Sequence, residues 1–238
     1  MKKILLMLLT AVFIGNYAFA QSMPDNVLNP KEKKQGWKLL FDGSTTTGWT
    51  SGDGKPTVAA QGAWEIDNGT LTLKKEAKGG DIFTVDEFGD FEFTADFNLV
   101  AGTNSGIKYF FTKYDKGGNL GCEFQIIDDV NGEDNKLADH LLGSLYDVLP
   151  PVETKKKVNP PGQWNTIRVI AKGKNVQHFV NGVKVLEYTR GSKEYADCVA
   201  DSKFSKVEPM FGTVEKGRIM LQDHHGPVAF KNLKIRSL

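Results

Sequence analysis

The chain has 238 residues, 40% of them hydrophobic and 25% charged, which allows one large all-β domain or two small ones with a sizeable core. Its 30 basic and 29 acidic side chains give a formal net charge of +1, so no overall field attracts nucleic acid or an anionic membrane surface. We therefore expect a partner that is recognised by local chemistry, and no nucleic acid.

Residues 1–20 have the pattern of an export signal. Two lysines at the start precede an apolar run from Ile4 to Ile14, and Ala18-Phe19-Ala20 gives the small-x-small pattern before a cleavage site. We expect cleavage after Ala20 and a periplasmic or secreted protein, with an uncleaved anchor as the alternative. No later stretch is apolar and long enough to cross a bilayer, so we expect no integral span in the mature chain.

Residues 21–35 are polar and lack periodicity, which indicates a leader laid over the domain surface or a short helix. Gly36–Phe41 then opens a domain that we expect to run from residue 36 to 238. Short strands are predicted at 63–66, 70–74 and 81–85, and Asn68-Gly69 suits a tight hairpin between the first two. The clearest alternation is at 91–100, where one face carries Phe91, Phe93, Ala95, Phe97 and Leu99.

The next predicted strand, 107–112, follows the small-residue turn that carries Asn104 and Ser105. Alternation places Lys108 and Phe110 on one of its faces, with the residues between them on the other. A lysine on this strand could reach a polar groove from a neighbouring position.

The run Gly121–Asp129 is the most informative stretch of the chain. Glu123 and Gln125 share one strand face, whereas the other face carries Cys122, Phe124 and Ile126. One side therefore fits a core and the other fits polar chemistry, as a sugar-binding groove requires. Asp128 and Asp129 follow where the strand should end, and they either cap a turn or touch the ligand.

A long loop after Asp129 carries four residues of chemical interest, which favour a functional loop: His140, Ser144, Tyr146 and Asp147. Ser144 has no His or Asp partner at a recognisable spacing, which argues against a serine hydrolase. Strands are predicted next at 163–171, 176–180 and 183–188, with Asn181-Gly182 as a type I′ turn and His178 as a surface hairpin residue.

Residues 189–216 form a helical or irregular insertion in which Phe204 and Phe211 should pack. The last strands are predicted at 217–223 and 228–236. In the first, Gln222 and His224 fall on the same side as Arg218 and Met220. This side therefore carries polar side chains at alternate positions, as the Glu123 and Gln125 side of its strand does.

Many short strands, little helix and repeated turns predict an all-β fold, a two-sheet antiparallel sandwich with a concave polar groove on one sheet. No repeat of fixed period is present, which weighs against a propeller or a solenoid. The two cysteines, Cys122 and Cys198, could form a disulfide in an exported protein, or Cys122 could stay a buried free thiol.

The chain resembles the 3-keto-disaccharide hydrolase family in the order of its motifs, from residue 36 to the C-terminus. These motifs are F-D-G-x(4)-G-W, N-S-G-I, E-F-Q-I-I-D-D, G-S-L-Y-D, G-Q-W-N-T-I-R-V, V-N-G-V-K-V and L-Q-D-H-H-G-P-V-A-F-K-N-L-K-I-R. The resemblance implies a concanavalin A-like jelly roll and a carbohydrate substrate already oxidised at C3 of a glucoside.

A ketone at C3 acidifies the proton on C2, so a base can remove that proton and the anomeric oxygen can leave by elimination. Water then adds to the enone. The site must supply a base, an electrophile for the enolate oxygen and a proton for the leaving group. We assign Glu123 and His224 to acid and base roles, and expect Lys108 or a glutamine amide to polarise the ketone.

Substrate binding is assigned to the surrounding polar residues: Gln125, Asp128, Asn104, Ser105, His140, Tyr146 and Gln222. A divalent cation is an alternative electrophile, with Asp128, His140 and His224 as candidate ligands, although no compact ligand spacing supports it. The alternatives to an enzyme are a non-catalytic carbohydrate-binding module and a surface scaffold domain. A Glu, His and Lys cluster favours the enzyme.

Overall fold

The computed structural model describes residues 24–52, 62–74, 80–115, 118–206, 210–224 and 226–238. The predicted signal peptide and its cleavage site lie outside these residues, as do the first three residues of the predicted leader. Within the described ranges, no helix has the length and apolar character needed to span a bilayer.

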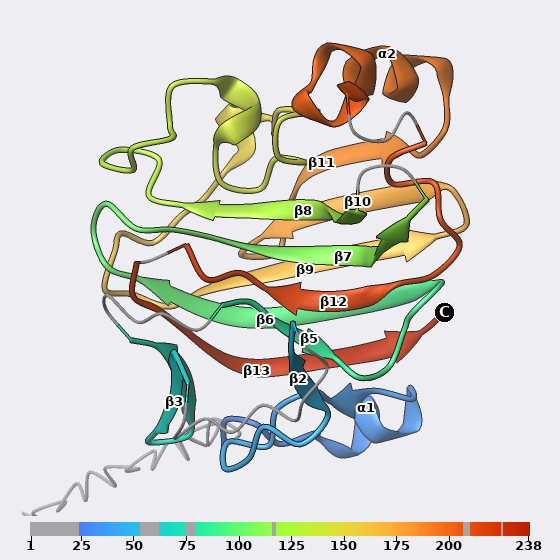
Figure 1. Cartoon of the computed structure of the whole chain (residues 1–238). Coiled ribbons are helices and arrows are strands. Elements are labelled where there is room, and N and C mark those ends of the chain that lie inside the picture. The colour runs from blue at the N-terminus through green and yellow to red at the C-terminus, as the bar shows by residue number, and fades with distance from the viewer. Residues whose placement is uncertain (1–23, 53–61, 75–79, 116–117, 207–209, 225) are drawn as a thin grey trace, which may run out of the picture.

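Two antiparallel sheets form the molecule, and Figure 1 shows them as two layers. The five-stranded sheet has the order β2-β5-β12-β7-β8, with bounds Trp49–Ser51, Ile82–Thr84, Arg218–Leu221, Asn104–Tyr114 and Gly118–Ile127. The eight-stranded sheet has the order β11-β10-β9-β6-β13-β4-β3, and β1 also pairs with β13. Its bounds are Val183–Thr189, Asn175–Val180, Asn165–Lys172, Phe91–Leu99, Val228–Ser237, Thr70–Leu73, Trp64–Asp67 and Lys38–Leu39. The jelly-roll sandwich predicted from the sequence is confirmed.

The core lies between the sheets and follows the predicted alternation. All five residues predicted on one face of β6 are buried: Phe91, Phe93, Ala95, Phe97 and Leu99. Across from them, β8 buries Cys122, Phe124 and Ile126. Each large apolar side chain removed from water contributes about 1.5–3 kcal/mol, so this interior holds the two sheets together.

Both predicted hairpins are present. Asn68 and Gly69 have φ values of 47° and 77° between β3 and β4, and Asn181 and Gly182 have 46° and 79° between β10 and β11. Positive φ at both central residues defines a type I′ turn, whose twist matches that of the flanking strands.

The predicted faces of β7 are wrong beyond Tyr109. The pairing of β7 with β8 shifts between Tyr109 and Thr112, and Phe110 has φ 53°. Phe110 therefore turns into the core, 5.6 Å from the ring centre of Phe91, and does not share a face with Lys108. An extra residue in one strand of a pair reverses the alternation that follows it.

The described part of the leader packs against the eight-stranded sheet. Asn26 and Asn232 exchange two backbone-to-side-chain hydrogen bonds of 2.6 and 2.8 Å. The short helix α1, Pro30–Lys34, follows with a capping box between Asn29 and Glu32. The leader is thus both a surface segment and a short helix.

The predicted insertion contains the helix α2, Lys193–Asp201, and the 3₁₀ turn η4, Lys203–Lys206. Phe204 and Phe211 are buried and stacked with ring centres 4.1 Å apart, which confirms their packing role. Two further 3₁₀ turns, η2 at Ala138–His140 and η3 at Glu153–Lys155, lie in the long loop after β8. Figure 1 shows this loop and α2 at the same end of the molecule, beside β8.

His178 does not lie on the surface, so that prediction is wrong. Its side chain is fully buried, with Nε2 2.7 Å from the Tyr109 hydroxyl and Nδ1 2.9 Å from the carbonyl oxygen of Gly143. The alternation of β10 points His178 inward with Val176 and Val180. Cys122 and Cys198 are both free thiols, and Cys122 is buried.

Candidate active site

The long loop after β8 runs along the open edge of that strand. The amide N of Gly143 donates to the Gln125 carbonyl over 3.0 Å, and the amide N of Gln125 donates to Ser144 over 3.3 Å. The amide N of Tyr146 donates to the Glu123 carbonyl over 3.1 Å. Residues 143–146 therefore extend the sheet beyond β8 and hold Tyr146 beside Glu123.

Glu123 lies directly opposite Lys108 in the β7–β8 pairing, and its Oε2 is 3.4 Å from Lys108 Nζ. The carboxyl group crosses the neighbouring Gly106, where a Cβ would stand 2.2 Å from Glu123 Oε1. Glu123 is only 4% exposed. Burial raises its pKa, and the charges of Lys108, Lys203 and His224 oppose that rise in part.

Three polar side chains on the same face as Glu123 carry buried atoms without a hydrogen-bond partner in the described part of the chain. These atoms are Oε1 and Nε2 of Gln125, Oδ1 of Asn104 and Oε1 of Gln222. They are four of the seven such atoms on described residues. An unpaired buried polar group costs about 1–3 kcal/mol, so their concentration at one place indicates groups kept for a ligand.

The register explains why these side chains meet. Asn104, Gly106 and Lys108 alternate along one face of β7 and stand opposite Ile127, Gln125 and Glu123 of β8. The amide N of Gln222 donates to the Gly106 carbonyl over 3.0 Å, so the hydrogen bonding between β12 and β7 continues one residue beyond the end of β12. The predicted polar strips on the three strands therefore belong to one face.

A network of hydrogen bonds flanks Glu123 on the side of the long loop. His140 Nδ1 lies 2.7 Å from Asp134 Oδ1, and its Nε2 lies 3.0 Å from Asp147 Oδ1. The Tyr146 hydroxyl donates to the other Asp134 oxygen over 2.7 Å, and the His140 and Tyr146 ring centres are 4.5 Å apart. Burial lowers the pKa of His140, but the Asp147 and Asp134 carboxylates outweigh it and the net change is upward. Both ring nitrogens are therefore held within this network.

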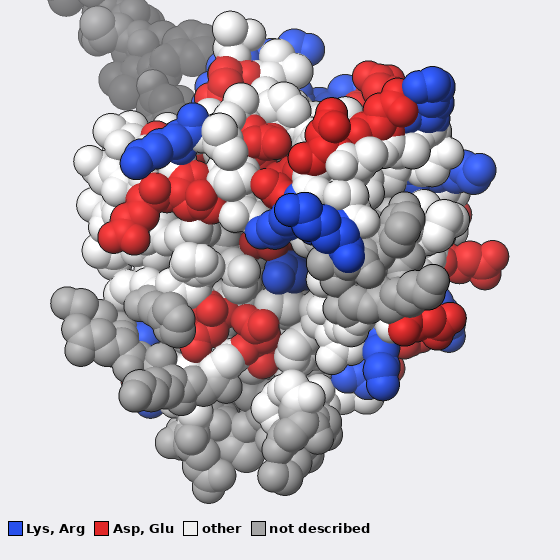
Figure 2. Space-filling view, turned by 45° about the horizontal axis from the view of Figure 1, so that its top comes forward, with Lys and Arg blue, Asp and Glu red and all other residues white. Residues whose placement is uncertain are grey.

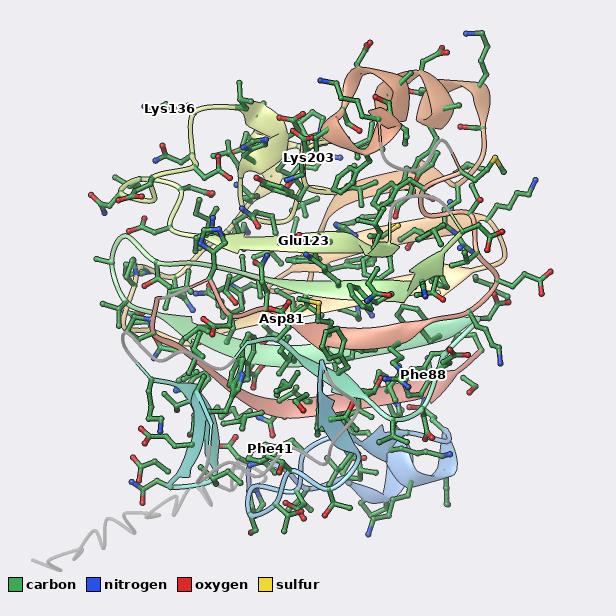
Figure 3. All side chains as sticks on the ribbon, in the orientation of Figure 1. Phe41, Asp81, Phe88, Glu123, Lys136 and Lys203 are labelled. Atoms are coloured by element: carbon green, nitrogen blue, oxygen red, sulfur yellow. The ribbon has the colours of Figure 1, made fainter. Side chains whose placement is uncertain are left out.

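Asp81 lies on the other side of Glu123, and Figure 3 shows Asp81 and Lys203 on either side of it. Asp81 Oδ1 accepts a 2.9 Å hydrogen bond from the Asp223 amide N. Burial raises its pKa, against the charges of Lys108 and His224. Figure 2 shows acidic and basic side chains meeting around a recess on this part of the surface.

Two of the predicted substrate-binding residues, Asp128 and Ser105, make hydrogen bonds within the structure. Asp128 accepts hydrogen bonds of 2.9–3.0 Å from the backbone of Gly102 and Val130 and from the Asn131 side chain, which lower its pKa. Ser105 is buried and donates to the Gln222 carbonyl over 3.0 Å. Asp128 thus caps the turn after β8, and Ser105 fastens β7 to the chain beyond β12.

The three candidate metal ligands Asp128, His140 and His224 do not form a metal site in the described part of the chain, where no group of three His, Cys, Asp or Glu side chains is placed to hold an ion. The Asp128 carboxylate accepts hydrogen bonds within its own turn, and the two ring nitrogens of His140 are hydrogen-bonded to Asp134 and Asp147. We therefore derive no step through a metal.

Sequence reasoning missed four residues that shape this site: Gly106, Asp81, Asp134 and Lys203. Asp81 stands at the start of a predicted strand, and Asp134 lies in a loop rich in acids, so neither has a distinctive spacing. Lys203 comes from the insertion that carried no functional signal. The N-S-G-I motif, which places Gly106 before an apolar residue, is the one local signal that could have indicated a close approach.

The chain is similar to known proteins over most of its length. The profile of the 3-keto-alpha-glucoside-1,2-lyase-like domain matches residues 36–236. A 3-keto-disaccharide hydrolase from Bacteroides thetaiotaomicron is 31% identical over 233 residues, which cover 85% of this chain and 79% of that protein. A solved structure assigned as a glycosyl hydrolase from Parabacteroides distasonis has a TM-score of 0.79 at 31% identity, covering 90% of this chain and 100% of that one. A second solved structure from the same organism has a TM-score of 0.64 at 29% identity, and the match covers 85% of this chain and 99% of that one.

Proposed function

Because the chain belongs to the 3-keto-alpha-glucoside-1,2-lyase-like domain family, we propose that it is a hydrolase that cleaves 3-keto-glucosides and 3-keto-disaccharides in the periplasm or outside the cell. The reaction begins with removal of the C2 proton, which the C3 ketone acidifies. The C1–O bond then breaks, the aglycone oxygen takes up a proton, and a C1=C2 double bond conjugated with the ketone is left. Water adds its hydroxyl to C1 and a proton to C2, so the sum of the steps is hydrolysis.

Glu123 is the base in this proposal. Its carboxylate is buried, and burial raises its pKa, which strengthens it as a proton acceptor. The Lys108 ammonium, 3.4 Å from Glu123, stabilises the negative charge that develops on the C3 oxygen. Proton transfer to a well-placed base supplies about 10²- to 10⁴-fold of a rate enhancement.

The proton for the leaving oxygen comes from the side of the site that holds His224 and Asp81. His224 follows Asp223, whose amide N donates to Asp81 Oδ1, and its charge lowers the pKa of both Glu123 and Asp81 against the effect of burial. Burial raises the pKa of Asp81, which favours a carboxyl group that can hold a proton. Both residues therefore suit the acid role.

The observation that carries the proposal is the combination of a buried carboxylate, Glu123, paired with the partly exposed Lys108, and unpaired amide groups on the same face. Gln125, Asn104 and Gln222 present buried donors and acceptors on the same face as Glu123, and sugar hydroxyls are the groups that such amides bind. A module that only binds sugars would instead present exposed aromatic platforms. The site thus combines hydroxyl recognition with a base.

Turnover of defined 3-keto-glucosides tests the proposal. We expect the purified protein to release the aglycone from 3-keto-trehalose or from an aryl 3-keto-glucoside, and we expect the parent glucosides, which lack the ketone, to remain intact. Chelator should leave this activity unchanged. Activity that is lost with chelator and restored by a divalent cation would assign the electrophile to a metal instead of Lys108.

Glu123→Gln tests the base directly. The amide has the size of the carboxyl group but cannot accept the C2 proton, so we expect kcat to fall by about 10³-fold. Glu65→Gln is the matched control, because Glu65 is an exposed residue of β3 on the other sheet. A Glu123→Gln protein that stays folded and keeps its turnover would remove Glu123 from the mechanism.

A further inference from the structure

The chain holds Lys203 over the β8 region through its backbone. The amide N of Lys203 donates to Asp147 Oδ2 over 2.8 Å, while the other oxygen of Asp147 contacts His140. Asp147 adopts φ 60°, a left-handed conformation that costs a non-glycine residue free energy. One strained residue thus fastens η4 to the loop that covers Glu123.

The Lys203 side chain then extends over the ring of Tyr146, and in the described part of the chain it does not pair with an acid. Its Nζ lies 4.1 Å from the centre of the Tyr146 ring, and Tyr146 is itself bonded to the Glu123 backbone. Within the described ranges, no carboxylate lies within ion-pair distance of this ammonium, and its recorded contacts are the rings of Tyr146 and Phe204. A lysine held over an aromatic ring without a salt bridge keeps its charge available for the site.

We propose that Lys203 is a positioning residue of this reaction, whose ammonium keeps the buried base Glu123 in its carboxylate form. The inference rests on the proposed function for its role in catalysis. When the Lys108 ammonium turns to the C3 oxygen of the substrate, Glu123 loses its 3.4 Å counter-charge. Lys203 then supplies the positive charge that keeps a buried carboxylate from taking a proton from water.

Several other charged or titratable groups face Glu123 and must be counted in any pH effect. Lys108 comes from β7, His224 follows β12 and the Tyr146 phenol comes from the loop. Asp81 faces Lys108 and His224 from the chain before β5. These groups stay the same when only Lys203 is changed, so a change at Lys203 isolates its own charge.

Direct titration of the Glu123 carboxyl group tests the inference without any substrate. In protein labelled with ¹³C at the glutamate side-chain carboxyl carbon, the Glu123 resonance is assigned as the signal absent from Glu123→Gln. We expect Lys203→Gln to move the titration midpoint upward by about half a pH unit or more, the size expected for one partly screened charge. The acid limb of kcat/KM against pH should move in the same direction.

Two variants serve as controls. Lys203→Arg keeps the charge and should keep the wild-type midpoint, and Lys206→Gln removes a charge at the other end of η4 and should also leave it unchanged.

An unchanged Glu123 midpoint in folded Lys203→Gln protein would overturn the inference, as would equal shifts in Lys203→Gln and Lys206→Gln. If Lys203→Gln unfolds, Lys203→Met, which also removes the charge, takes its place, and a midpoint that stays at the wild-type value in that variant overturns the inference instead. The NMR titration does not depend on turnover, so a failure of the proposed reaction would be seen separately, as the absence of aglycone release by the wild-type protein.

Discussion

The position of Glu123 depends on the absence of a side chain at residue 106. Gly106 stands opposite Gln125 on β7, and the Glu123 carboxyl group fills the space where its Cβ would be. This is a close approach of a functional group to the backbone, which glycine permits in the middle of a strand. Gly106 and Glu123 therefore depend on each other, because the missing side chain of Gly106 leaves the space that the Glu123 carboxyl group occupies.

Gly106→Ala should lower activity strongly, with a smaller effect on folding. The added Cβ would lie 2.2 Å from Glu123 Oε1, so the carboxyl group must move away from Lys108. We expect kcat/KM to fall by about 10²-fold, since a displacement of about 1 Å at a reacting group can cost that much. Steady-state kinetics on a 3-keto-glucoside, with circular dichroism as the folding check, would measure it.

Gly52→Ala is the control for this change. Residue 52 does not have a positive φ, and the nearest atom to an added Cβ is a Phe83 ring carbon at 3.8 Å, an ordinary contact. If Gly106→Ala retained wild-type kcat/KM, the carboxyl position seen here would not be the one that reacts.

At the scale of elements, the bulge in β7 determines which side chains the site receives. Tyr109 and Phe110 both turn into the core, so Lys108 remains on the outer face while the strand continues to Tyr114. Two glycines accommodate the bulge. A Cβ on Gly217 would lie 2.4 Å from the Phe110 carbonyl carbon, and one on Gly121 would lie 3.0 Å from the Phe111 Cα.

Gly217→Ala should therefore destabilise the fold. Backbone atoms cannot move aside as the end of a flexible side chain can, so we expect a loss of about 1–3 kcal/mol in the free energy of unfolding, the usual cost of overpacking. Urea unfolding would measure it. Gly62→Ala, where the nearest atom to the added Cβ is 4.0 Å away, should stay within about 0.5 kcal/mol of the wild type. Equal midpoints for the two variants would show that the bulge relaxes without cost.

The bulge also marks where sequence reasoning stops. The alternation at 91–100 and the Asn-Gly turns are local signals, so the strands and hairpins that they predict are present. The positive φ of Phe110 and the inward turn of Phe110 depend on Gly217, more than 100 residues away, and no local pattern carries that contact. Glu123, Gln125 and Lys108 could be placed on one face because their strands are regular up to Tyr109.

The partners of the site from outside the strands could not be predicted in the same way. Lys203 is separated from Glu123 by 80 positions and enters through the turn after α2, and Asp81 enters from the chain before β5. His178, by contrast, follows a local pattern, because alternation along β10 places it in the core with Val176 and Val180 although histidine is a polar residue.

At the scale of the whole molecule, a series of buried hydrogen bonds joins the two sheets to the loop that covers the site. The Tyr109 hydroxyl of the five-stranded sheet lies 2.7 Å from both His178 Nε2 and the Tyr188 hydroxyl of the eight-stranded sheet. His178 Nδ1 is 2.9 Å from the carbonyl oxygen of Gly143, and an Nδ1–H there would donate to it. The neighbouring residues of this loop contact Gln125 and Glu123, so the interior supports the loop directly.

His178 should make the whole fold sensitive to acid. Burial lowers the pKa of its imidazole from 6.5 to about 4. Between these pH values the unfolded chain binds a proton that the folded chain excludes, so the free energy of unfolding falls as the pH decreases. The contribution of neutral His178 to the free energy of unfolding is complete above pH 6.5 and is lost below about pH 4. A pKa change of this size corresponds to about 3 kcal/mol.

Urea unfolding of the wild type and of His178→Gln between pH 4 and 7.5 would measure this contribution. The glutamine does not titrate, so the decrease in stability between pH 6.5 and 4 should be shallower in the variant by about 3 kcal/mol. At pH 7.5 the variant should be less stable by about 1–3 kcal/mol, because the amide cannot replace both buried hydrogen bonds. The carboxyl groups of Glu123 and Asp81, whose pKa values are raised, act with the opposite sign but equally in both proteins. Parallel curves for the two proteins would mean that the pKa of His178 is the same in the folded and the unfolded chain, so burial would not exclude its proton.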